Sequence, residues 1–295
     1  MNNRILAGLV LCFMVLACGA TTPADAEVFL DAARKAYPTP AWSGYTNTLV
    51  RDYCIKTADV ADRPVSGGRI RWHHVDGMRN VRDIGGWNGL ATGRAFRGSE
   101  PDCRPREFQA ARKKPFHDLN VTEDGLKTMH EVLKIKTDLD LRAESECPHP
   151  GKSALGVRLV RVPLGAYMAA FSQTNQYAQA IRVFADPANY PVYFHCWGGA
   201  DRTGTLAFLL EGLCGASETD LSIDYELTSF AGVFGVRRRD GTKSFSFPAF
   251  VARLKSYPGK TLAEQIAAYM QTTLGITPDE IAAIRRNLRQ DPPLQ

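Results

Sequence analysis

The sequence predicts an α/β fold, because short apolar runs typical of strands alternate with segments of helical periodicity. The clearest strand is Val192–Cys196, a β-prone run that ends in His-Cys before a loop with two adjacent glycines. The clearest helical pattern lies over 175–184, where apolar residues recur on one face. With 295 residues, 44% of them hydrophobic, the chain can form one sizeable core, and we expect a single domain over residues 27–295.

The segments before Val192 follow the same alternation. In chain order we expect a short helix over 26–36, a strand over 69–75, a glycine-rich loop over 80–93, a short strand over 94–97, a helix over 122–133, and strands over 135–141 and 157–162. The best-marked start is that of the helix at Thr122, a capping residue followed by two acidic residues.

Helices dominate the chain after the His-Cys strand. An apolar helix that includes 206–213 follows the glycine loop, and further helices are expected over 217–230, 245–257, 261–275 and 277–289. Ser217 and Thr261 are each followed three residues later by an acidic residue, which is typical of a capping box. Thr277 precedes Pro278, and proline is favoured in the first position of a helix.

Residues 1–26 have the pattern of a targeting segment. Arg4 precedes a nearly all-apolar run over 5–17, which is short for a transmembrane helix. Two kinds of processing stay open. Ala24–Ala26 fits the small-residue pattern of signal-peptide cleavage, whereas Val15–Cys18 resembles a lipobox in which Cys18 carries a lipid. Both predict export to the periplasm or cell envelope, and only the second adds a membrane anchor.

The cysteine content fits an exported protein with one functional thiol. Of seven cysteines, an odd number stays after removal of the targeting segment. Cys214 lies on the apolar helix and is expected in the core. We expect one disulfide among Cys54, Cys103 and Cys147, and the sequence does not choose the pair.

Charge and composition limit the classes of ligand. The formal net charge of +5 is modest; it favours anionic substrates but not nucleic acid, and aromatic and basic residues do not interleave. No cysteine or histidine spacing is typical of a zinc site, since His73 and His74 are adjacent and lack further ligands nearby. We therefore expect no metal site.

The loop after the His-Cys strand carries the chemistry. Over 192–204 the sequence is Val-Tyr-Phe-His-Cys-Trp-Gly-Gly-Ala-Asp-Arg-Thr-Gly. A loop that opens a helix directs several backbone N–H groups at one point, where the helix dipole adds positive potential. Cys196 lies at the mouth of this loop, so we expect its thiol pKa to fall from about 8.5 into the range of roughly 3.5–7.5. Arg202 ends the loop with a planar fork that fits two phosphate oxygens, an arrangement that favours nucleophilic attack on phosphorus.

This pattern, His195-Cys196, five residues, then Arg202-Thr203, resembles the signature of cysteine-dependent protein tyrosine and dual-specificity phosphatases. Two upstream segments, Asn-Val-Arg-Asp-Ile-Gly-Gly over 80–86 and Asp-Leu-Asp-Leu-Arg-Ala-Glu over 138–144, resemble the branch of bacterial secreted tyrosine and lipid phosphatases. The resemblance covers roughly 69–230. It implies a central, mostly parallel sheet flanked by helices, a phosphocysteine intermediate and no cofactor.

The resemblance also assigns roles within the loop. His195 is expected to support the loop and the thiolate by hydrogen bonding, with an ordinary core histidine as the alternative. Thr203 is expected to donate a hydrogen bond to the sulfur. Arg82, Arg97 and Arg142 are expected to be ion-pair partners, with a positive field at the site as the alternative. The residues expected to bind phosphate are Trp197, Gly198, Gly199, Ala200, Asp201 and Arg202.

The general acid is missing from its usual place. In the best-known branches of the family, an aspartate on a mobile loop before the nucleophile strand protonates the leaving oxygen. The corresponding stretch here, 164–175, contains no carboxylate. Asp201 is the first candidate, because an aspartate there resembles the arrangement in myotubularin-like lipid phosphatases; its alternative role is to tie the loop to a neighbouring N–H. Asp83 is the second candidate, and its alternative role is to brace a glycine turn.

These residues predict phosphomonoester hydrolysis, with phosphotyrosine or dual-specificity protein substrates. Phosphoinositides or inositol polyphosphates are the alternative, favoured by Asp201 and by the basic run Arg237–Arg239. A protein that only binds phosphorylated ligands is the alternative of another class, and a rhodanese-like sulfurtransferase fits the spacing less well. We expect a monomer.

Overall fold

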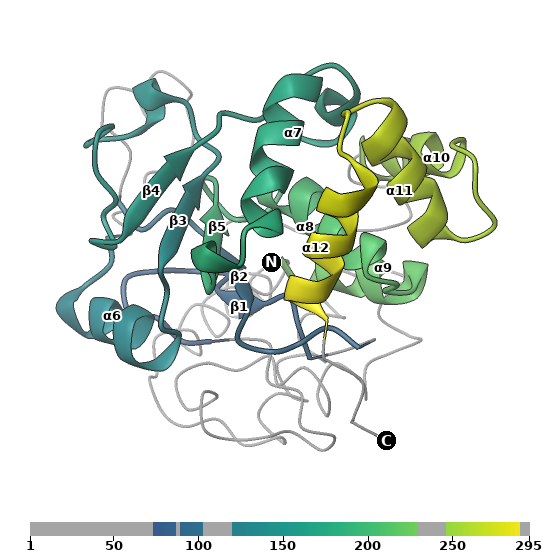
Figure 1. Ribbon diagram of the computed structural model, residues 1–295. Coiled ribbons are helices and arrows are strands. Elements are labelled where there is room, and N and C mark those ends of the chain that lie inside the picture. The colour runs from purple at the N-terminus through teal and green to yellow at the C-terminus, as the bar shows by residue number, and fades with distance from the viewer. Residues whose placement is uncertain (1–72, 87–88, 103–119, 229–245, 290–295) are drawn as a thin grey trace, which may run out of the picture. The chain divides into compact units, whose positions relative to one another are not determined.

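The computed structural model describes residues 73–86, 89–102, 120–228 and 246–289 (Figure 1). The chain divides into two compact units, Met1–His74 and Val75–Gln295, and every element below belongs to the second. The predicted features that lie outside the described residues are the targeting segment over 1–26, the helix over 26–36, Cys54, Cys103 and Arg237–Arg239. One domain over 27–295 stays a prediction, because residues 27–72 also lie outside them.

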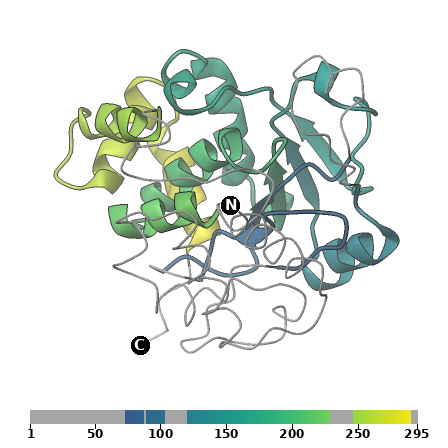
Figure 2. The ribbon, with the colours of Figure 1, turned by 180° about the vertical axis from the view of Figure 1, so that it is seen from behind.

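Five strands form one mostly parallel sheet in the order β1-β2-β5-β3-β4, which Figures 1 and 2 show from opposite sides. Their bounds are Arg82–Asp83 for β1, Ala95–Gly98 for β2, Thr137–Asp140 for β3, Arg158–Arg161 for β4 and Val192–His195 for β5. β1 is antiparallel to β2, and the remaining pairs are parallel. The predicted α/β fold with a mostly parallel sheet is confirmed, and the strand that precedes Cys196 lies at the centre of the sheet.

The helices follow the predicted order. Their bounds are Glu123–Lys127 for α6, Thr174–Arg182 for α7, Arg202–Leu213 for α8, Glu218–Leu227 for α9, Ser246–Lys255 for α10, Leu262–Thr272 for α11 and Pro278–Leu288 for α12. A π-helical turn, η2, covers Thr128–Val132, and short 3-10 turns are Glu144–Glu146 (η3), Tyr167–Phe171 (η4), Val183–Ala185 (η5) and Pro187–Asn189 (η6). Thr261 makes the predicted capping box, Thr277 makes one as well, and Thr122 accepts a hydrogen bond from the N–H of Gly125.

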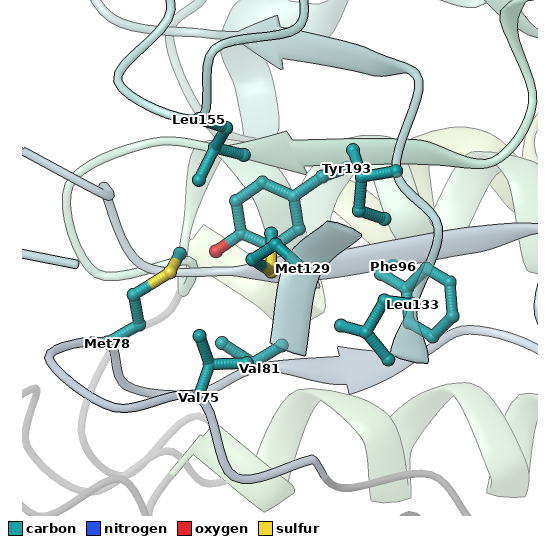
Figure 3. Close-up of a cluster of buried hydrophobic side chains, with 9 residues drawn as sticks. Val75, Met78, Val81, Phe96, Met129, Leu133, Leu155 and Tyr193 are labelled. Carbon is teal, nitrogen blue, oxygen red and sulfur yellow. The ribbon is translucent and has the colours of Figure 1, made fainter. Parts of the chain in front are cut away.

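Apolar side chains cover both faces of the sheet. On one face Tyr193 packs with Met129 and Leu133 from the α6–η2 segment (Figure 3). The next residue of β5, Phe194, contacts Phe184 with ring centroids 5.5 Å apart, on the opposite face, because successive strand residues alternate. Helix α8 is buried from residue 205 to residue 213, which explains why its sequence is apolar without a polar face. The Cys196 strand and helix are thus enclosed by the core.

Two predicted elements differ from the structure. The strand expected over 69–75 is wrong in its described part, because 73–75 is irregular and Val75 instead joins the apolar cluster. The loop expected over 80–93 contains β1, whose Arg82 pairs with Arg97 of β2. Arginine and aspartate are poor indicators of a strand, so the sequence pattern did not predict β1. The conformation of β1 is determined by its pairing with the edge of β2 that β5 leaves open.

Candidate active site

The Cys196 loop, residues 196–201, connects the end of β5 to the start of α8, at the carboxyl end of the parallel strands. Neighbouring segments hold its entry from both sides. The N–H of Leu141 donates to the carbonyl of His195, and the N–H of Glu100 donates to the carbonyl of Trp197, both at 2.9 Å. Ligands of open α/β sheets bind at this edge, so the loop lies where a substrate is expected.

Gly199 allows the loop to pass close to the neighbouring strand. Its φ is +63°, a conformation that side chains with a Cβ rarely adopt. A Cβ at this position would lie 2.2 Å from the carbonyl oxygen of Gly98. Only glycine fits here, which gives a physical reason for the second glycine of the pair.

The carbonyl groups of the loop are held from the side opposite the expected phosphate. Asn80 Nδ2 donates to the carbonyls of Gly198 at 2.9 Å and Gly199 at 3.2 Å. Arg97 Nη2 donates to the carbonyls of Gly199 at 2.6 Å and Ala200 at 3.3 Å. Because the C=O and N–H of one peptide unit point in opposite directions, these bonds favour N–H groups that face the pocket.

Asp224 on α9 connects the supports of the loop. Its carboxylate accepts from Arg82 Nε at 2.8 Å and also from Arg97 Nη1. Arg82 in turn donates to Asn80 Oδ1. All four side chains are buried, so one carboxylate holds two arginines out of water beside the loop. The expectation that Arg82 and Arg97 are ion-pair partners is confirmed.

Cys196 is 3% exposed, and its surroundings favour the thiolate. Burial by itself raises the pKa of the thiol, but the Arg202 guanidinium and the neighbouring Thr203 lower it, and the net pKa is below the ordinary value. Thr203, in the first turn of α8, is fully buried. The loop therefore favours ionisation of the nucleophile next to a fixed cation.

Arg202 is oriented by a residue outside the loop. Its Nη1 donates to Glu146 Oε2 at 2.7 Å, and its Nη2 donates to Glu146 Oε1 at 3.1 Å. Nη1 also donates to the carbonyl of Leu141 at 3.3 Å. This two-pronged contact fixes the plane of the guanidinium, as bidentate arginine–carboxylate pairs do.

His195 is the residue directly before the nucleophile in the chain and is completely buried. Its Nε2 is 2.9 Å from Asp138 Oδ1, and its Nδ1 is 3.3 Å from the carbonyl oxygen of Cys196. Burial alone lowers the pKa of His195, but Asp140 and Asp138 raise it to about 8. A charged imidazole is attracted to Asp138 through Nε2 and can donate through Nδ1 to the carbonyl of Cys196, which supports the loop at the nucleophile.

Arg142 forms a second buried ionic cluster on the other side of the site. It donates to Asp140 Oδ2 at 2.9 Å, Glu100 Oε2 at 3.0 Å and Asp102 Oδ1 at 2.7 Å. Because Asp140 neighbours both Arg142 and His195, the carboxylate is strongly favoured and its pKa lies well below the ordinary value, against the effect of its burial. Arg142 is therefore an ion-pair partner, as expected, and its cluster fixes the segment that leads to Glu146.

The two candidate acids have different surroundings. Asp83, on β1, accepts from the N–H of Gly85 at 2.7 Å and from the N–H of Gly93 at 2.6 Å, which fits a residue that braces a glycine turn. Asp201 is half-buried at the end of the Cys196 loop, and its Oδ1 accepts from the Tyr167 hydroxyl at 2.6 Å. Asp201 is thus the candidate that lies beside Arg202 and the nucleophile.

The disulfide prediction is corrected for one of its three cysteines. Cys147 is a thiol whose Sγ lies 3.4 Å from Asp140 Oδ2, and burial raises its pKa to about 12. Cys214 is a buried thiol at the end of α8, as predicted. A pair of Cys54 and Cys103 lies outside the described residues.

Within the described residues, no cluster of three or more histidine, cysteine or acidic side chains is suited to a metal ion. In the same part of the chain, no helix combines the length and apolar character needed to cross a membrane.

Comparison with known families decides the identity of the chain. Residues 73–290, most of its length, match the tyrosine phosphatase family. The protein is a member of this family. It is accordingly a cysteine-dependent phosphomonoesterase. No curated protein matches the chain.

Solved structures give a more distant similarity. The core catalytic domain of the PP-IP phosphatase SIW14 from S. cerevisiae, in complex with citrate, is 24% identical, with 52% of this chain and 80% of that chain covered and a TM-score of 0.36. A second structure of the Siw14 catalytic core is 21% identical, with 50% of this chain and 76% of that chain covered and a TM-score of 0.34.

The fold of the phosphatase brings the predicted loop residues together. It also brings Glu146, Tyr167 and Asp224 to the site, which the sequence pattern did not indicate. Glu146 lies two residues past the second upstream segment, and its position near a motif was the available signal. Tyr167 lies in the stretch over 164–175 that lacks a carboxylate, and a tyrosine there is not an indicator of a general acid. Asp224 has no local signal, because an acidic residue in a helix is ordinarily exposed.

Proposed function

We propose that this phosphatase hydrolyses phosphomonoesters in two displacements at Cys196, with phosphotyrosine or dual-specificity protein substrates. The observation that carries the proposal is a thiol of lowered pKa beside an arginine whose fork Glu146 holds in place. A nucleophile and a bidentate phosphate ligand at the start of one helix suit attack on phosphorus.

In the first displacement the Cys196 thiolate attacks phosphorus and the bond from phosphorus to the ester oxygen breaks. The loop N–H groups and Arg202 hold the equatorial oxygens, where charge is greatest in the transition state. Asp201 gives its proton to the leaving oxygen, since it is the carboxyl group at the loop. The products of this step are phosphocysteine and the free alcohol or phenol.

In the second displacement a water molecule attacks the phosphocysteine. Asp201, now a carboxylate, accepts a proton from the water while the sulfur–phosphorus bond breaks. Thr203 and Arg202 stabilise the departing thiolate, because both favour the charged form of Cys196. Inorganic phosphate leaves, and Asp201 is again protonated for the next cycle.

Phosphate release from an aryl phosphate tests the mechanism. Wild type and Cys196→Ser are compared in the presence of a metal chelator, with Cys214→Ser as the matched control, because Cys214 is a buried thiol at the far end of the same helix. We expect activity in the wild type and in the control, and loss of turnover in Cys196→Ser. A Cys196→Ser protein as active as the wild type, or a wild type inactivated by the chelator, contradicts the mechanism.

The substrate class requires its own panel. Phosphotyrosine peptides, phosphoserine and phosphothreonine peptides, phosphoinositides and inositol polyphosphates are compared at matched concentration by kcat/KM. Phosphotyrosine peptides are expected to be the best substrates. A preference for inositol-containing esters favours the alternative, in which the Asp201 position next to Arg202 reflects multiply phosphorylated substrates.

Export follows from the pattern over residues 1–26, and we propose that the mature phosphatase works in the periplasm or cell envelope. Mass spectrometry of the mature N-terminus tests this. A start at Glu27 indicates signal-peptide cleavage, and a lipid-modified Cys18 indicates a lipoprotein. An intact N-terminus on a protein that stays in the cytoplasm contradicts export.

A further inference from the structure

The segment that lacks a carboxylate reaches the Cys196 loop through a tyrosine. The hydroxyl of Tyr167 donates to Asp201 Oδ1 at 2.6 Å, and its backbone N–H donates to Thr205 Oγ1 at 2.8 Å. The Thr205 hydroxyl in turn donates to the carbonyl of Asp201 at 2.8 Å. Tyr167 is therefore attached to the start of α8 at both its backbone and its side chain, and both attachments lead to Asp201.

The backbone of Tyr167 has an uncommon conformation. Its φ is +54°, in the left-handed region that large side chains seldom adopt. Such strain persists only where the surroundings determine the conformation, and it is concentrated at functional sites. Here the ring of Tyr167 makes edge-to-face contacts with Tyr225 and Phe250, with centroids 6.4 Å and 6.5 Å away. The packing and the Thr205 contact together direct the hydroxyl at Asp201 and not at solvent.

This contact distinguishes the two oxygens of the Asp201 carboxyl group. A neutral carboxyl group has one O–H and one carbonyl oxygen, and the oxygen that accepts from a tyrosine hydroxyl is the carbonyl oxygen. With Tyr167 donating to Oδ1, the proton of neutral Asp201 lies on Oδ2. An acid is effective only when its proton is within reach of the leaving oxygen, so the choice of oxygen matters.

We propose that Tyr167 is the positioning residue of the general acid and keeps the transferable proton of Asp201 on Oδ2. This rests on the proposed function, in which Asp201 is the acid. In the first displacement the Oδ2–H bond breaks and the leaving oxygen gains that proton. In the second, Oδ2 accepts a proton from the attacking water. Tyr167 keeps its own proton in both steps and orients a carboxyl group that the segment 164–175 does not itself contain.

Tyr167→Phe removes only the hydroxyl and keeps the ring that contacts Tyr225 and Phe250. The readout is kcat/KM on phosphate esters whose leaving groups range from acidic phenols to alkyl alcohols. A general acid contributes about 10²–10⁴-fold, mostly for basic leaving groups, and a misdirected acid is expected to lose part of this. We expect about a tenfold loss on alkyl esters and little change with an acidic phenol, hence a steeper dependence on leaving-group basicity.

Double substitution tests whether Tyr167 acts through Asp201. Residues that act as one unit have non-additive effects. Asp201→Asn is expected to lose more activity on alkyl esters than Tyr167→Phe, and Tyr167→Phe is expected to add nothing in the Asp201→Asn background. Additive losses overturn the proposal, since they assign Tyr167 an effect that does not pass through Asp201.

Tyr269→Phe is the matched control. The Tyr269 hydroxyl donates to the carbonyl of Ala170 at 2.6 Å, so it anchors the same 3-10 turn, η4, without contacting Asp201. Its leaving-group dependence is expected to equal that of the wild type; a steeper dependence in this variant overturns the proposal, because loosening the turn would suffice. Thr205→Val, which removes the acceptor for the Tyr167 N–H, is expected to give the steeper dependence and serves if Tyr167→Phe does not fold.

The proposed function and the positioning role of Tyr167 can fail separately. If turnover does not require Cys196, the proposed function fails together with the role of Tyr167. If turnover requires Cys196 but the leaving-group dependence of Tyr167→Phe equals that of the wild type, the positioning role alone is overturned and the two-displacement mechanism remains.

Discussion

Glu146 holds both terminal nitrogens of Arg202, at 2.7 Å and 3.1 Å, across 56 positions of sequence. The carboxylate is buried, whereas the arginine is half-buried and turns toward the site. An arginine has five N–H groups, so a fork held at Nη1 and Nη2 still offers its Nε–H and the second N–H of Nη2 to two phosphate oxygens. The phosphate ligand is thus oriented before the substrate binds, and no binding energy is needed to fix it.

Glu146→Gln is expected to reduce kcat/KM by about 10- to 100-fold, because a neutral amide accepts only at its oxygen and the fork loses one of its two contacts. Phosphate-ester kinetics measure the loss. Glu144→Gln is the matched control, because Glu144 is exposed on the same short turn and is expected to leave the rate unchanged. Equal rates in wild type and Glu146→Gln contradict the role of this pair.

Asp224→Asn is expected to destabilise the fold by about 3–5 kcal/mol, the typical cost of leaving buried charge uncompensated. The variant leaves Arg82 and Arg97 in the core without their shared carboxylate. Urea unfolding measures the change. Glu218→Gln on the same helix removes an exposed ion pair with Lys255 and is expected to be nearly neutral. A small effect at Asp224 shows that the two arginines find other partners.

The sequence predicted those parts of the site that are contiguous in the chain. The strand, loop and helix around Cys196 follow from a β-prone run, a glycine pair and an apolar helix, each a local pattern. What it missed are side chains that arrive from elsewhere. Glu146 and Asp224 reach the loop only because of the order of the strands and the packing of α9, and single-sequence patterns contain neither.

The general acid shows a second limit of prediction from the sequence. In the best-known branches of the family, the stretch that corresponds to 164–175 supplies the acid, whereas here it contains no carboxylate. The contact of Tyr167 with Asp201 cannot be predicted from sequence patterns, because it depends on a left-handed backbone conformation that a tyrosine rarely adopts. Local propensity is least informative at such a point of backbone strain.

The charge of His195 makes stability depend on pH. Its pKa is about 8 in the fold and 6.5 as the ordinary value, so its stabilising contribution is complete below about 6.5 and is lost as the pH rises through about 8. Asp138→Asn removes a carboxylate that raises this pKa. The stability gap between wild type and variant, from urea unfolding between pH 6 and 9, is therefore expected to narrow as the pH rises. A constant gap contradicts a charged His195.

Cys196 is expected to react with iodoacetate at pH 7 at least about 100-fold faster than Cys147 or Cys214, because only thiolates attack. The pKa of each of the other two thiols is raised to about 12, chiefly by burial. Peptide mapping by mass spectrometry identifies the modified residue. Inorganic phosphate, which competes for the loop and Arg202, is expected to slow the reaction. Faster modification of Cys147 or Cys214, or no protection by phosphate, contradicts the assignment.

Substitutions at two glycines with positive φ distinguish the effect of backbone strain from the effect of a close contact with a neighbouring strand. Gly199→Ala introduces both, because φ is +63° and its Cβ would lie 2.2 Å from the carbonyl oxygen of Gly98. Gly215→Ala, just past the end of α8, introduces strain alone, because φ is +98° and no atom lies within 4 Å of its Cβ.

We expect Gly215→Ala to lose about 1 kcal/mol of stability and no activity, since the added methyl group meets open space. Gly199→Ala is expected to lower kcat/KM by about 100-fold or more, because relief of the clash must displace the loop that aims its N–H groups at phosphate, and shifts of about 1 Å cost that much. Steady-state kinetics and urea unfolding on both variants measure the two effects. If the two substitutions reduce activity equally, backbone strain and not the contact with Gly98 determines the loop.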